Sequence, residues 1–355
     1  MKIAVYSIMK NESKHIDRFM DGCEGADCVV VLDTGSTDDS VLRLKKRGAS
    51  VYQEQIEPWR FDTARNRSLE LVPTDIDFCI CIDLDEILLP GWRAEMERCP
   101  SWTTRIIYWH RNMNDADDKN AEYYPHHKAH SRHGFRWSGA IHEELRHIGP
   151  NHDFEFYSNL KVDHIQDRGK KREYLPLLLT ALKECPDDGR LYHYVVLEYM
   201  YVDDYENMWK YAKEALNNSR VKIWDMQAAY LCSLVASVAE RKEYYDDAQT
   251  WLIEGVLQCP RDREPWFRLA KWHYEHKEFV KASRFANSAL ELDKRQLLNI
   301  SELDAWNGTL DLIAASSAAE CGNRKEADVH YLRAMRRYPN NDDLIHSYAN
   351  FLSKK

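Results

Sequence analysis

The sequence has no apolar run long enough to cross a membrane, and it has little glycine for its length. The first apolar stretch, residues 3–9, runs directly into Lys10-Asn11-Glu12, so it suits a first strand better than a secretion signal. The 13 glycines among 355 residues favour packed helices over a turn-rich β-sandwich. We therefore expect a cytoplasmic protein that is densely helical over part of its length.

An excess of positive charge and paired cysteine motifs are also missing. The chain has 49 Lys and Arg residues against 58 Asp and Glu, and its net charge of −9 argues against a protein that binds nucleic acid through bulk charge. Its nine cysteines are an odd number and include no C-x-x-C pair, so we expect reduced thiols. The length itself favours two domains with real cores.

Residues 1–167 alternate short apolar runs with helical patterns. Buried strands are predicted at residues 3–8, 28–32, 51–52 and 78–82, and helices at 17–22, 40–47 and 64–71. Strands that alternate with crossover helices form a mainly parallel sheet, whose ligands bind beyond the carboxyl ends of the strands. The first domain is therefore predicted to be an α/β domain.

Residues 168–355 lose the strand pattern and carry a helical repeat. Four segments share one pattern. Each begins with a small or flexible residue, which is followed by a small residue seven positions later and an apolar residue eight positions later: Met208/Ala215/Leu216, Ala248/Gly255/Val256, Ala282/Ala289/Leu290 and Ala327/Ala334/Met335. Their starts are about 40, 34 and 45 residues apart, around the tetratricopeptide period of about 34. We predict an all-α, tetratricopeptide-like domain, with a non-repetitive helical bundle as the alternative.

The clearest chemistry follows the strand predicted at 78–82. Asp83 and Asp85 stand two residues apart, so strand alternation sends both carboxylates to the same side, at the ligand end of the sheet. Two such carboxylates suit a divalent cation whose other ligands are phosphate oxygens. The alternative is a solvated turn or a helix cap.

Five segments occur in the order and spacing of glycosyltransferase family 2. They read SIMKNE at 7–12, VLDTGSTD at 31–38, WRFDTARN at 59–66, DLDE at 83–86 and FRWSGAIHE at 135–143. The first half of the chain therefore resembles that family, whose fold is of the Rossmann-like GT-A type. With its repeats, the whole chain resembles the bacteriocin peptide S-glycosyltransferases, which have tetratricopeptide-like C-terminal halves.

The resemblance implies an inverting sugar transfer from a nucleotide-sugar donor, with a UDP-sugar expected, and Mn²⁺ or Mg²⁺ as cofactor. Asp85 is the expected direct metal ligand, and Asp83 is expected on the ribose or a metal-bound water. His164, near the end of the predicted catalytic domain, is expected to place its imidazole on the metal or the diphosphate. The remaining histidines between 108 and 164 lack a clean ligand spacing, and a structural role is the alternative for His164 as well.

Six further residues are expected at the donor: Glu12, Asp33, Asp62, Arg65, Asn66 and Trp137. Glu12 and Asp33 would accept hydrogen bonds from the nucleobase and ribose, and Arg65 would offset diphosphate charge. Trp137 is a candidate to stack on the sugar or the base. Simpler roles stay open, namely a helix cap for Asp33 and a surface salt bridge for Arg65.

Glu143 is the expected catalytic base, because the matched segment places an acidic residue directly after His142. Glu144 is the alternative base, since neighbouring side chains point in different directions. His142 is expected to line the sugar or acceptor pocket, or else to be structural. In the competing interpretation, Glu143 pairs with an arginine such as Arg136 and shapes the acceptor loop.

The acceptor group is expected to be a hydroxyl or a thiol. Concave repeat surfaces commonly bind peptides or support self-association, which favours a peptide or protein acceptor and a homodimer formed through the repeats. Four tryptophans could supply that surface as well as internal packing: Trp224, Trp251, Trp266 and Trp306. A glycan or modified DNA is the alternative acceptor, and a non-enzymatic repeat scaffold with a degenerate transferase domain is the alternative function.

Overall fold

The computed structural model describes residues 1–113, 121–165, 174–293, 295 and 302–353. By its internal contacts the chain divides into two compact units, Met1–Ala181 and Leu182–Lys355. The domain boundary expected after residue 167 lies outside the described residues. All nine cysteines lie in the described part and are free thiols, as predicted. Among the described helices, none combines the length and the apolar character needed to cross a membrane.

The first unit is built on an eight-stranded sheet with the order β3-β2-β1-β4-β7-β6-β10-β5. Its strands are β1 (Ile3–Met9), β2 (Cys28–Asp33), β3 (Ser50–Gln53), β4 (Phe78–Cys81), β5 (Glu86–Leu88), β6 (Arg105–Met113), β7 (Tyr123–Ser131) and β10 (Glu155–Ile165). A separate hairpin is formed by β8 (Phe135–Ser138) and β9 (Glu144–His147).

The two halves of this sheet differ in strand direction. β1 pairs in parallel with β2 and β4, and β2 pairs in parallel with β3, as the unbroken apolar runs predict. β7 then pairs antiparallel with β4 and β6, β10 runs parallel to β6, and β5 runs antiparallel to β10. The sheet is therefore mixed, with the predicted parallel arrangement in its first four strands.

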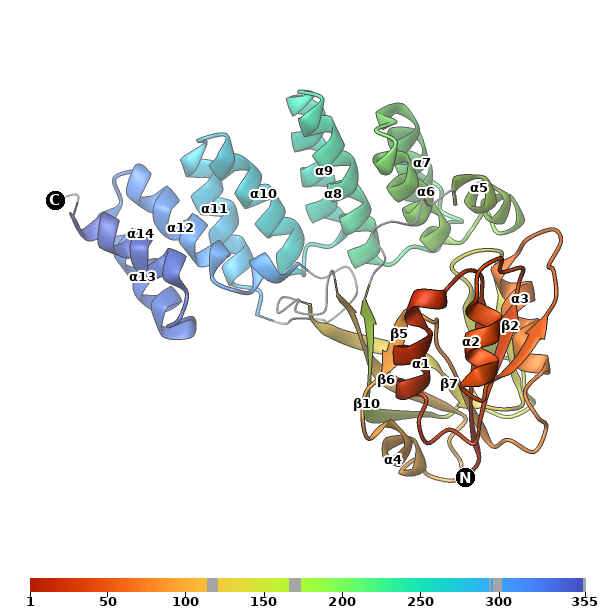
Figure 1. The fold of residues 1–355 in the computed structure, drawn as a ribbon. Helices are drawn as coiled ribbons and strands as arrows, with labels where there is room; N and C mark the ends of the chain where they lie inside the picture. Colours follow the sequence, from red (N-terminus) through yellow and green to blue (C-terminus); the bar gives the residue numbers. More distant parts are fainter. Residues whose placement is uncertain (114–120, 166–173, 294, 296–301, 354–355) are drawn as a thin grey trace. The chain divides into compact units, whose positions relative to one another are not determined.

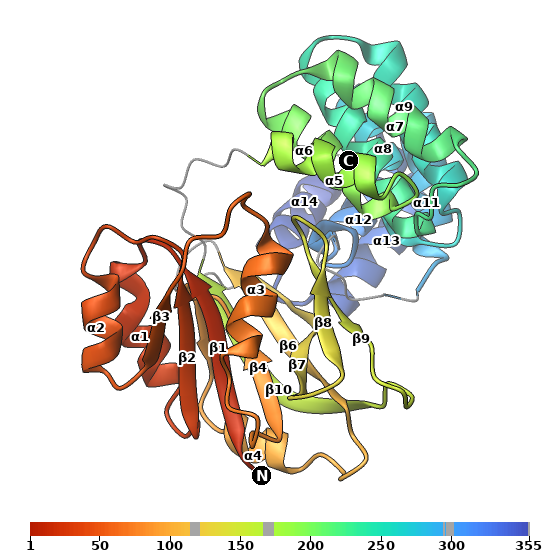
Figure 2. The same ribbon diagram turned by 90° about the vertical axis from the view of Figure 1, so that its right-hand side faces the viewer.

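Both faces of the sheet are covered. Its helices are α1 (Ile16–Gly22), α2 (Ser40–Lys46), α3 (Phe61–Glu70) and α4 (Trp92–Glu97), with a 3₁₀ turn at Ser13–His15. Figure 1 shows α1 and α2 on one face, and Figure 2 shows α3 and the β8–β9 hairpin on the other. Alternate side chains of β1 serve the two cores: Val5 packs in the cluster that holds Leu44, and Tyr6 packs in the cluster that holds Leu69. Burial on both faces explains why β1 is continuously apolar.

The second unit is helical. Its helices are α6 (Gly189–Tyr201), α7 (Tyr205–Asn217), α8 (Asp225–Arg241), α9 (Tyr245–Gln258), α10 (Arg263–Glu275), α11 (Phe279–Leu290), α12 (Thr309–Glu320), α13 (Arg324–Arg337) and α14 (Asp342–Ser353), with a 3₁₀ turn at Leu303–Ala305, and α5 (Leu175–Glu184) spans the division. Consecutive helices pair as α6/α7, α8/α9, α10/α11 and α12/α13 (Figure 1). No strand occurs among the described residues of 190–340, so the predicted fold class is confirmed: an α/β domain followed by an all-α array of helix pairs.

The repeated small residues lie on the second helix of each pair. Ala248, Ala282 and Ala327 are fully buried, which lets the paired helices approach closely. Two residues beyond the end of the first helix of each pair lies a residue with positive φ, and each is five positions before a repeated segment: Asp203, Glu243, Lys277 and Gly322. At each of these ends the next N–H donates to the carbonyl five residues back at 2.8–2.9 Å, a Schellman motif. The repeat is therefore encoded in both the packing positions and the turns.

Three of the four tryptophans expected on the surface pack inside the helical unit. Trp251 is buried, and Trp266 and Trp306 pack against the core cluster around Phe267. Of the four, Trp224 is exposed, at 69%. These residues therefore give little support to a self-association surface, and the homodimer stays a prediction.

Candidate functional site

A cavity of about 510 Å³ lies where β1 and β4 end. Its wall is formed by Ile8, Met9, Lys10, Asn11, Glu12, Thr34, Trp59, Phe61, Arg65, Asp83, Leu84, Asp85, His164 and Tyr174. Parallel neighbours β1 and β4 end at the same edge of the sheet, so Glu12 and the Asp83-Asp85 pair come from adjacent strands. The structure thus brings together five of the predicted site residues: Glu12, Arg65, Asp83, Asp85 and His164.

Asp85 and His164 face each other at this cavity. His164 on β10 lies directly opposite Glu86 of β5 and Asn112 of β6, and its Nε2 is 3.4 Å from Asp85 Oδ2. Its other ring nitrogen, Nδ1, is 2.9 Å from Asn112 Oδ1. The second ring nitrogen is hydrogen-bonded, which fixes the orientation of the imidazole. The carboxylate oxygen and the first ring nitrogen together form a donor set that a divalent cation can use.

The electrostatics around His164 also favour positive charge. Burial alone would lower the pKa of His164, but Asp85 outweighs burial and raises that pKa above its ordinary value, with smaller contributions from Glu86 and Asp83. The same carboxylates that stabilise an imidazolium would stabilise a bound cation.

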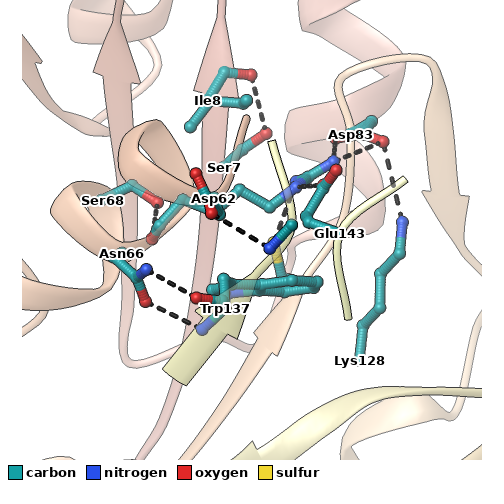
Figure 3. A network of polar contacts seen from close by, with 12 residues as sticks. Ser7, Ile8, Asp62, Asn66, Ser68, Asp83, Lys128, Trp137 and Glu143 are labelled. Atoms are coloured by element: carbon teal, nitrogen blue, oxygen red, sulfur yellow. Dashed lines mark hydrogen bonds and ion pairs between the residues drawn. The ribbon is translucent and has the colours of Figure 1, made fainter. Parts of the chain in front are cut away.

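Asp83 is held by two cationic side chains. Arg65 Nη2 lies 2.9 Å from Asp83 Oδ1, and Lys128 Nζ lies 3.7 Å from Asp83 Oδ2 (Figure 3). Burial would lower the pKa of Lys128, but Glu86 and Asp83 outweigh it and raise that pKa. Because two cations already neutralise Asp83, the geometry favours Asp85 over Asp83 as the direct metal ligand.

A buried cluster behind the acidic pair escaped the sequence analysis. Glu86 accepts hydrogen bonds from the Asp83 N–H at 2.8 Å and from His110 Nε2 at 2.9 Å, and Lys128 Nζ is 3.7 Å away. Burial would raise the pKa of Glu86, but Lys128 and His110 hold that pKa well below its ordinary value. Among the described residues, ligand atoms of Glu86, His110 and His164 lie within 4.8 Å of one another. Because Lys128 already supplies positive charge beside Glu86, a position beside Asp85 is better suited to a metal.

Arg65 joins the acidic pair to the expected base. Its Nε donates to Glu143, its Nη1 lies 3.2 Å from Cys81 Sγ, and its guanidinium stacks 5.2 Å from the Trp137 ring centre (Figure 3). The alternative in which Glu143 pairs with an arginine is therefore the arrangement observed, although the arginine is Arg65 instead of Arg136. Glu143 lies outside the residues that line the cavity.

The two neighbours of Glu143 also lie outside the cavity lining. His142 has a φ of 49° and packs its ring edge-on to Tyr174, with 6.5 Å between ring centres. Glu144 begins β9 and accepts a hydrogen bond from Arg146 at 3.3 Å. The predicted pocket-lining role of His142 and the alternative base role of Glu144 therefore stay predictions, and both residues lie outside the cavity wall.

Asp33 and Asp62, expected at the donor, are engaged in turns beside the cavity. Asp33 is buried and accepts hydrogen bonds from the Ser36 N–H at 3.0 Å and the Gln53 amide at 3.1 Å. It closes a turn and does not cap α2, which begins at Ser40 with Asp39 at its N-cap. Asp62 accepts the Gly139 N–H at 3.0 Å. Burial would raise the pKa of Asp62, but a bidentate ion pair with Arg60 helps to lower that pKa below its ordinary value.

Asn66 and Trp137, also expected at the donor, hold α3 against the β8–β9 hairpin. The Asn66 amide exchanges two hydrogen bonds of 2.8 Å with the backbone of Trp137. The Trp137 ring is 2% exposed, and its Nε1 donates to the Tyr6 hydroxyl at 2.8 Å. The structure thus places Trp137 in the core, so it is not positioned to stack on a ligand.

The aromatic side chains that do line the cavity are Trp59, Phe61 and Tyr174. The Trp59 and Phe61 ring centres are 5.1 Å apart, and those of Phe61 and Tyr174 are 6.2 Å apart. Trp59 opens the matched segment at 59–66, but Trp137 also lies in a matched segment, so the motifs do not distinguish the two tryptophans. Aromatic character alone does not separate a core residue from a cavity residue either.

No protein-family model matches the chain. Among curated proteins it is similar to an uncharacterized glycosyltransferase of Rickettsia conorii, with 31% identity over 121 residues that cover 31% of this chain and 42% of the relative. A second uncharacterized glycosyltransferase, of Rickettsia bellii, is 29% identical over 121 residues that cover 31% of this chain and 40% of the relative. The chain thus spans less than half the length of these relatives. The predicted resemblance to glycosyltransferases is confirmed.

The solved structures that are similar to the chain include a repeat protein and a synthase. A tetratricopeptide protein of Thermus thermophilus matches 50% of this chain and 88% of its own, with 19% identity and a TM-score of 0.33. Glucosyl-3-phosphoglycerate synthase of Mycobacterium tuberculosis matches 31% of this chain and 44% of its own, with 25% identity and a TM-score of 0.27.

Proposed function

We propose that the chain is a glycosyltransferase that uses a nucleotide-sugar donor and a divalent cation, Mn²⁺ or Mg²⁺, held by Asp85 and His164. The observation that carries this proposal is the convergence of Glu12, Arg65 and these two residues in one cavity at the carboxyl ends of β1 and β4. The similarity to curated glycosyltransferases supports it. The family 2 assignment, the inverting course and the UDP-sugar donor are parts of the proposal.

The charge of the site is suited to one divalent cation. Among the described residues around Asp83, three carboxylates pair with the buried cations Arg65 and Lys128, namely Asp83, Glu86 and Glu143, and a fourth carboxylate, Asp85, lies beside His164. With neutral histidines this set has two negative charges in excess. When bound at Asp85 and His164, the cation would stabilise the charge that develops on the departing diphosphate.

The walls of the cavity suit the rest of the donor. Glu12 can accept hydrogen bonds from an imide N–H or a ribose hydroxyl. Trp59 and Phe61 offer aromatic faces to a base or a sugar ring. Glu143 holds Arg65, which in turn holds Asp83, so this proposal gives Glu143 a positioning role in place of the base role predicted from sequence.

The acceptor in this proposal is a hydroxyl or thiol of a peptide or protein, which loses its proton, attacks the anomeric carbon of the donor sugar in a single displacement and releases the nucleotide diphosphate. The helical repeats favour such an acceptor by analogy with other repeat arrays, whose surfaces bind extended chains. Cell-envelope glycan and modified DNA are the acceptors that the experiment must separate from it.

The proposal is tested by incubating the protein with Mn²⁺ and a panel of nucleotide sugars and measuring nucleotide diphosphate release. We expect turnover of one donor or a few, which excess EDTA abolishes. Candidate peptides, glycans and DNA are then screened by mass spectrometry for the mass of the transferred sugar. A protein that turns over no donor with either Mn²⁺ or Mg²⁺ would be the repeat scaffold, and the proposal would fail.

A further inference from the structure

A row of hydrogen bonds connects the far side of His164 to polar residues of three other strands. Asn112 on β6 lies directly opposite His164 in the strand register, and Tyr124 on β7 lies directly opposite His110 of β6. His110 and Asn112 are two residues apart on one strand, so their side chains share a face. The register therefore brings Glu86, His110, Tyr124, Asn112 and His164 into one continuous row.

The direction of every hydrogen bond in this row follows from its buried end. The Glu86 carboxylate only accepts, so His110 Nε2 carries a hydrogen and donates to it at 2.9 Å. In a neutral ring His110 Nδ1 is then an acceptor, and the Tyr124 hydroxyl, 2.9 Å away, donates to it. The Tyr124 oxygen in turn accepts from Asn112 Nδ2 at 2.9 Å.

This leaves Asn112 Oδ1 facing His164 Nδ1 at 2.9 Å. An amide oxygen cannot donate, so Nδ1 of His164 must carry the hydrogen. The lone pair of the neutral ring is then on Nε2, the nitrogen that lies 3.4 Å from Asp85 Oδ2. The row thus selects the tautomer that can bind a metal at the cavity.

We propose that the Glu86–His110–Tyr124–Asn112 row is a positioning relay, which fixes the tautomer and ring orientation of His164 for a divalent cation. The metal part of this inference rests on the proposed function, whereas the tautomer part does not. Metal-binding histidines commonly donate their second N–H to an oxygen, and loss of that partner weakens metal binding by about 10- to 100-fold. Asn112 is therefore a positioning residue that acts through His164.

Burial supports a fixed direction for the row. Glu86 is 3% exposed and His110 is 2% exposed, so reversing the row would cost both of them hydrogen bonds that water cannot replace. Lys128 and the Asp83 N–H also hold the Glu86 carboxylate in place from its other sides. The buried end is thus rigid, and its orientation is passed along the row to His164.

The tautomer is tested by ¹⁵N NMR of the histidine rings in the metal-free protein at pH 9, well above the ordinary histidine pKa of about 6.5. Wild type should show His164 with a protonated Nδ1 and a bare Nε2. Asn112→Leu should show a mixture of both tautomers, whereas Asn112→Asp, which keeps an oxygen at this position, should preserve the wild-type form. Asn159→Leu, on the same strand as His164, is the matched control and should change nothing. Wild-type His164 with its hydrogen on Nε2 would overturn the proposal.

Metal binding is tested by electron paramagnetic resonance of free Mn²⁺ in titrations of the same variants. Asn112→Leu should bind Mn²⁺ about 10- to 100-fold more weakly than wild type, Tyr124→Phe should lose less, and Asn112→Asp should stay within a few-fold of wild type. Equal Mn²⁺ affinity in Asn112→Leu and wild type would overturn the relay while the proposed function stands. Absence of Mn²⁺ binding to wild type would instead refute the proposed metal site, and the NMR result would still decide the tautomer. Melting temperatures close to wild type establish that the variants fold.

Discussion

Both units of this chain bury charged side chains, but in the sheet unit these gather at one site. In the sheet unit, Arg65, Glu86 and His110 are almost fully buried, and their partners converge beside one cavity. In the helical unit, the repeated positions bury alanine, as at Ala282 and Ala289, and the buried Asp311 of α12 accepts a hydrogen bond from Arg333 of α13, whose side chain is 35% exposed.

Burying charge is costly unless every group is paired, whereas burying alanine costs little. The contrast teaches that the sheet unit holds buried charged groups whose burial is costly unless each is paired. A functional site would require such groups. The sequence of the helical unit is set mainly by close packing. Paired substitutions at buried and exposed positions test this contrast in each unit.

The largest effect is expected from Asp85→Asn in the sheet unit. Loss of this carboxylate should reduce donor turnover by about 10³-fold or more, because metal stabilisation of the leaving group contributes several kcal/mol. The free energy of unfolding should change by less than about 1 kcal/mol, since the side chain is at the cavity surface. Asp75→Asn, at a surface carboxylate that is 66% exposed, is the control and should leave turnover unchanged. Wild-type turnover in Asp85→Asn would contradict the assignment.

The next effect concerns the stability of the sheet unit. Arg65→Met removes the partner of Glu143 and Asp83, and breaking a buried ion pair from one side costs about 3–5 kcal/mol. Arg67→Met, on the same helix, removes ion pairs of a side chain that is 39% exposed and should cost about 1 kcal/mol or less. Urea denaturation measures both values. Equal losses of unfolding free energy in the two variants would show that burial of the Arg65 ion pairs does not increase their contribution to stability.

In the helical unit the sensitive quantity is space. A Cβ added at Gly189 would meet Lys222 O at 2.5 Å and the Ile223 Cβ at 2.6 Å, so Gly189→Ala should destabilise the unit by about 1–3 kcal/mol. Val280→Ile also adds one carbon, but at a side chain that is 69% exposed, and should be neutral within about 0.5 kcal/mol. Thermal denaturation followed by circular dichroism compares the two. A Gly189→Ala protein as stable as Val280→Ile would mean that the close approach is not needed.

The smallest expected effect is a pH dependence in each unit. Burial lowers the pKa of His130 in the sheet unit to about 3 and the pKa of His193 in the helical unit to about 4. The unfolded chain binds a proton at these residues below about pH 6.5 while the folded chain does not, so stability falls as the pH drops below 6.5. Each histidine should cost about 1–2 kcal/mol at pH 5.

Substitution separates the two contributions. His193→Phe should make the unfolding free energy less dependent on pH between 6.5 and 4, and His130→Phe should do so between 6.5 and 3. His152→Gln, at an exposed residue, serves as the control and should leave the slope as in wild type. A slope that is the same in all three variants and wild type would mean that neither buried histidine is responsible.

Only part of the sheet could be predicted from sequence, and the reason is burial. The strands at 28–32 and 78–82 are covered on both faces, so they read as unbroken apolar runs. β7, in contrast, reads YYPHHKAHS, and most of its side chains are polar or partly exposed. Such a strand resembles a loop, which is why the antiparallel half of the sheet was missed. The helical repeat was predictable because small residues recur at fixed positions.

The residues of the site also differ in whether the sequence could predict them. Glu12, Asp83 and Asp85 directly follow apolar strands, so their place at the cavity could be predicted. Lys128 and Asn112 reach the site only through the pairing of β6, β7 and β10, and strand register is not written in a local motif. A motif also cannot tell a ligand contact from an internal hydrogen bond. Asn66 and Trp137 belong to matched segments and yet bond to each other.

The central claim is that the cavity binds a nucleotide diphosphate through a divalent cation held at Asp85. Isothermal titration of UDP into the full-length protein, once with Mn²⁺ and once with EDTA, tests this claim most directly. The account predicts UDP binding that is at least about tenfold tighter with Mn²⁺, and loss of that difference in Asp85→Asn. UDP binding of equal strength with Mn²⁺ and with EDTA would contradict it.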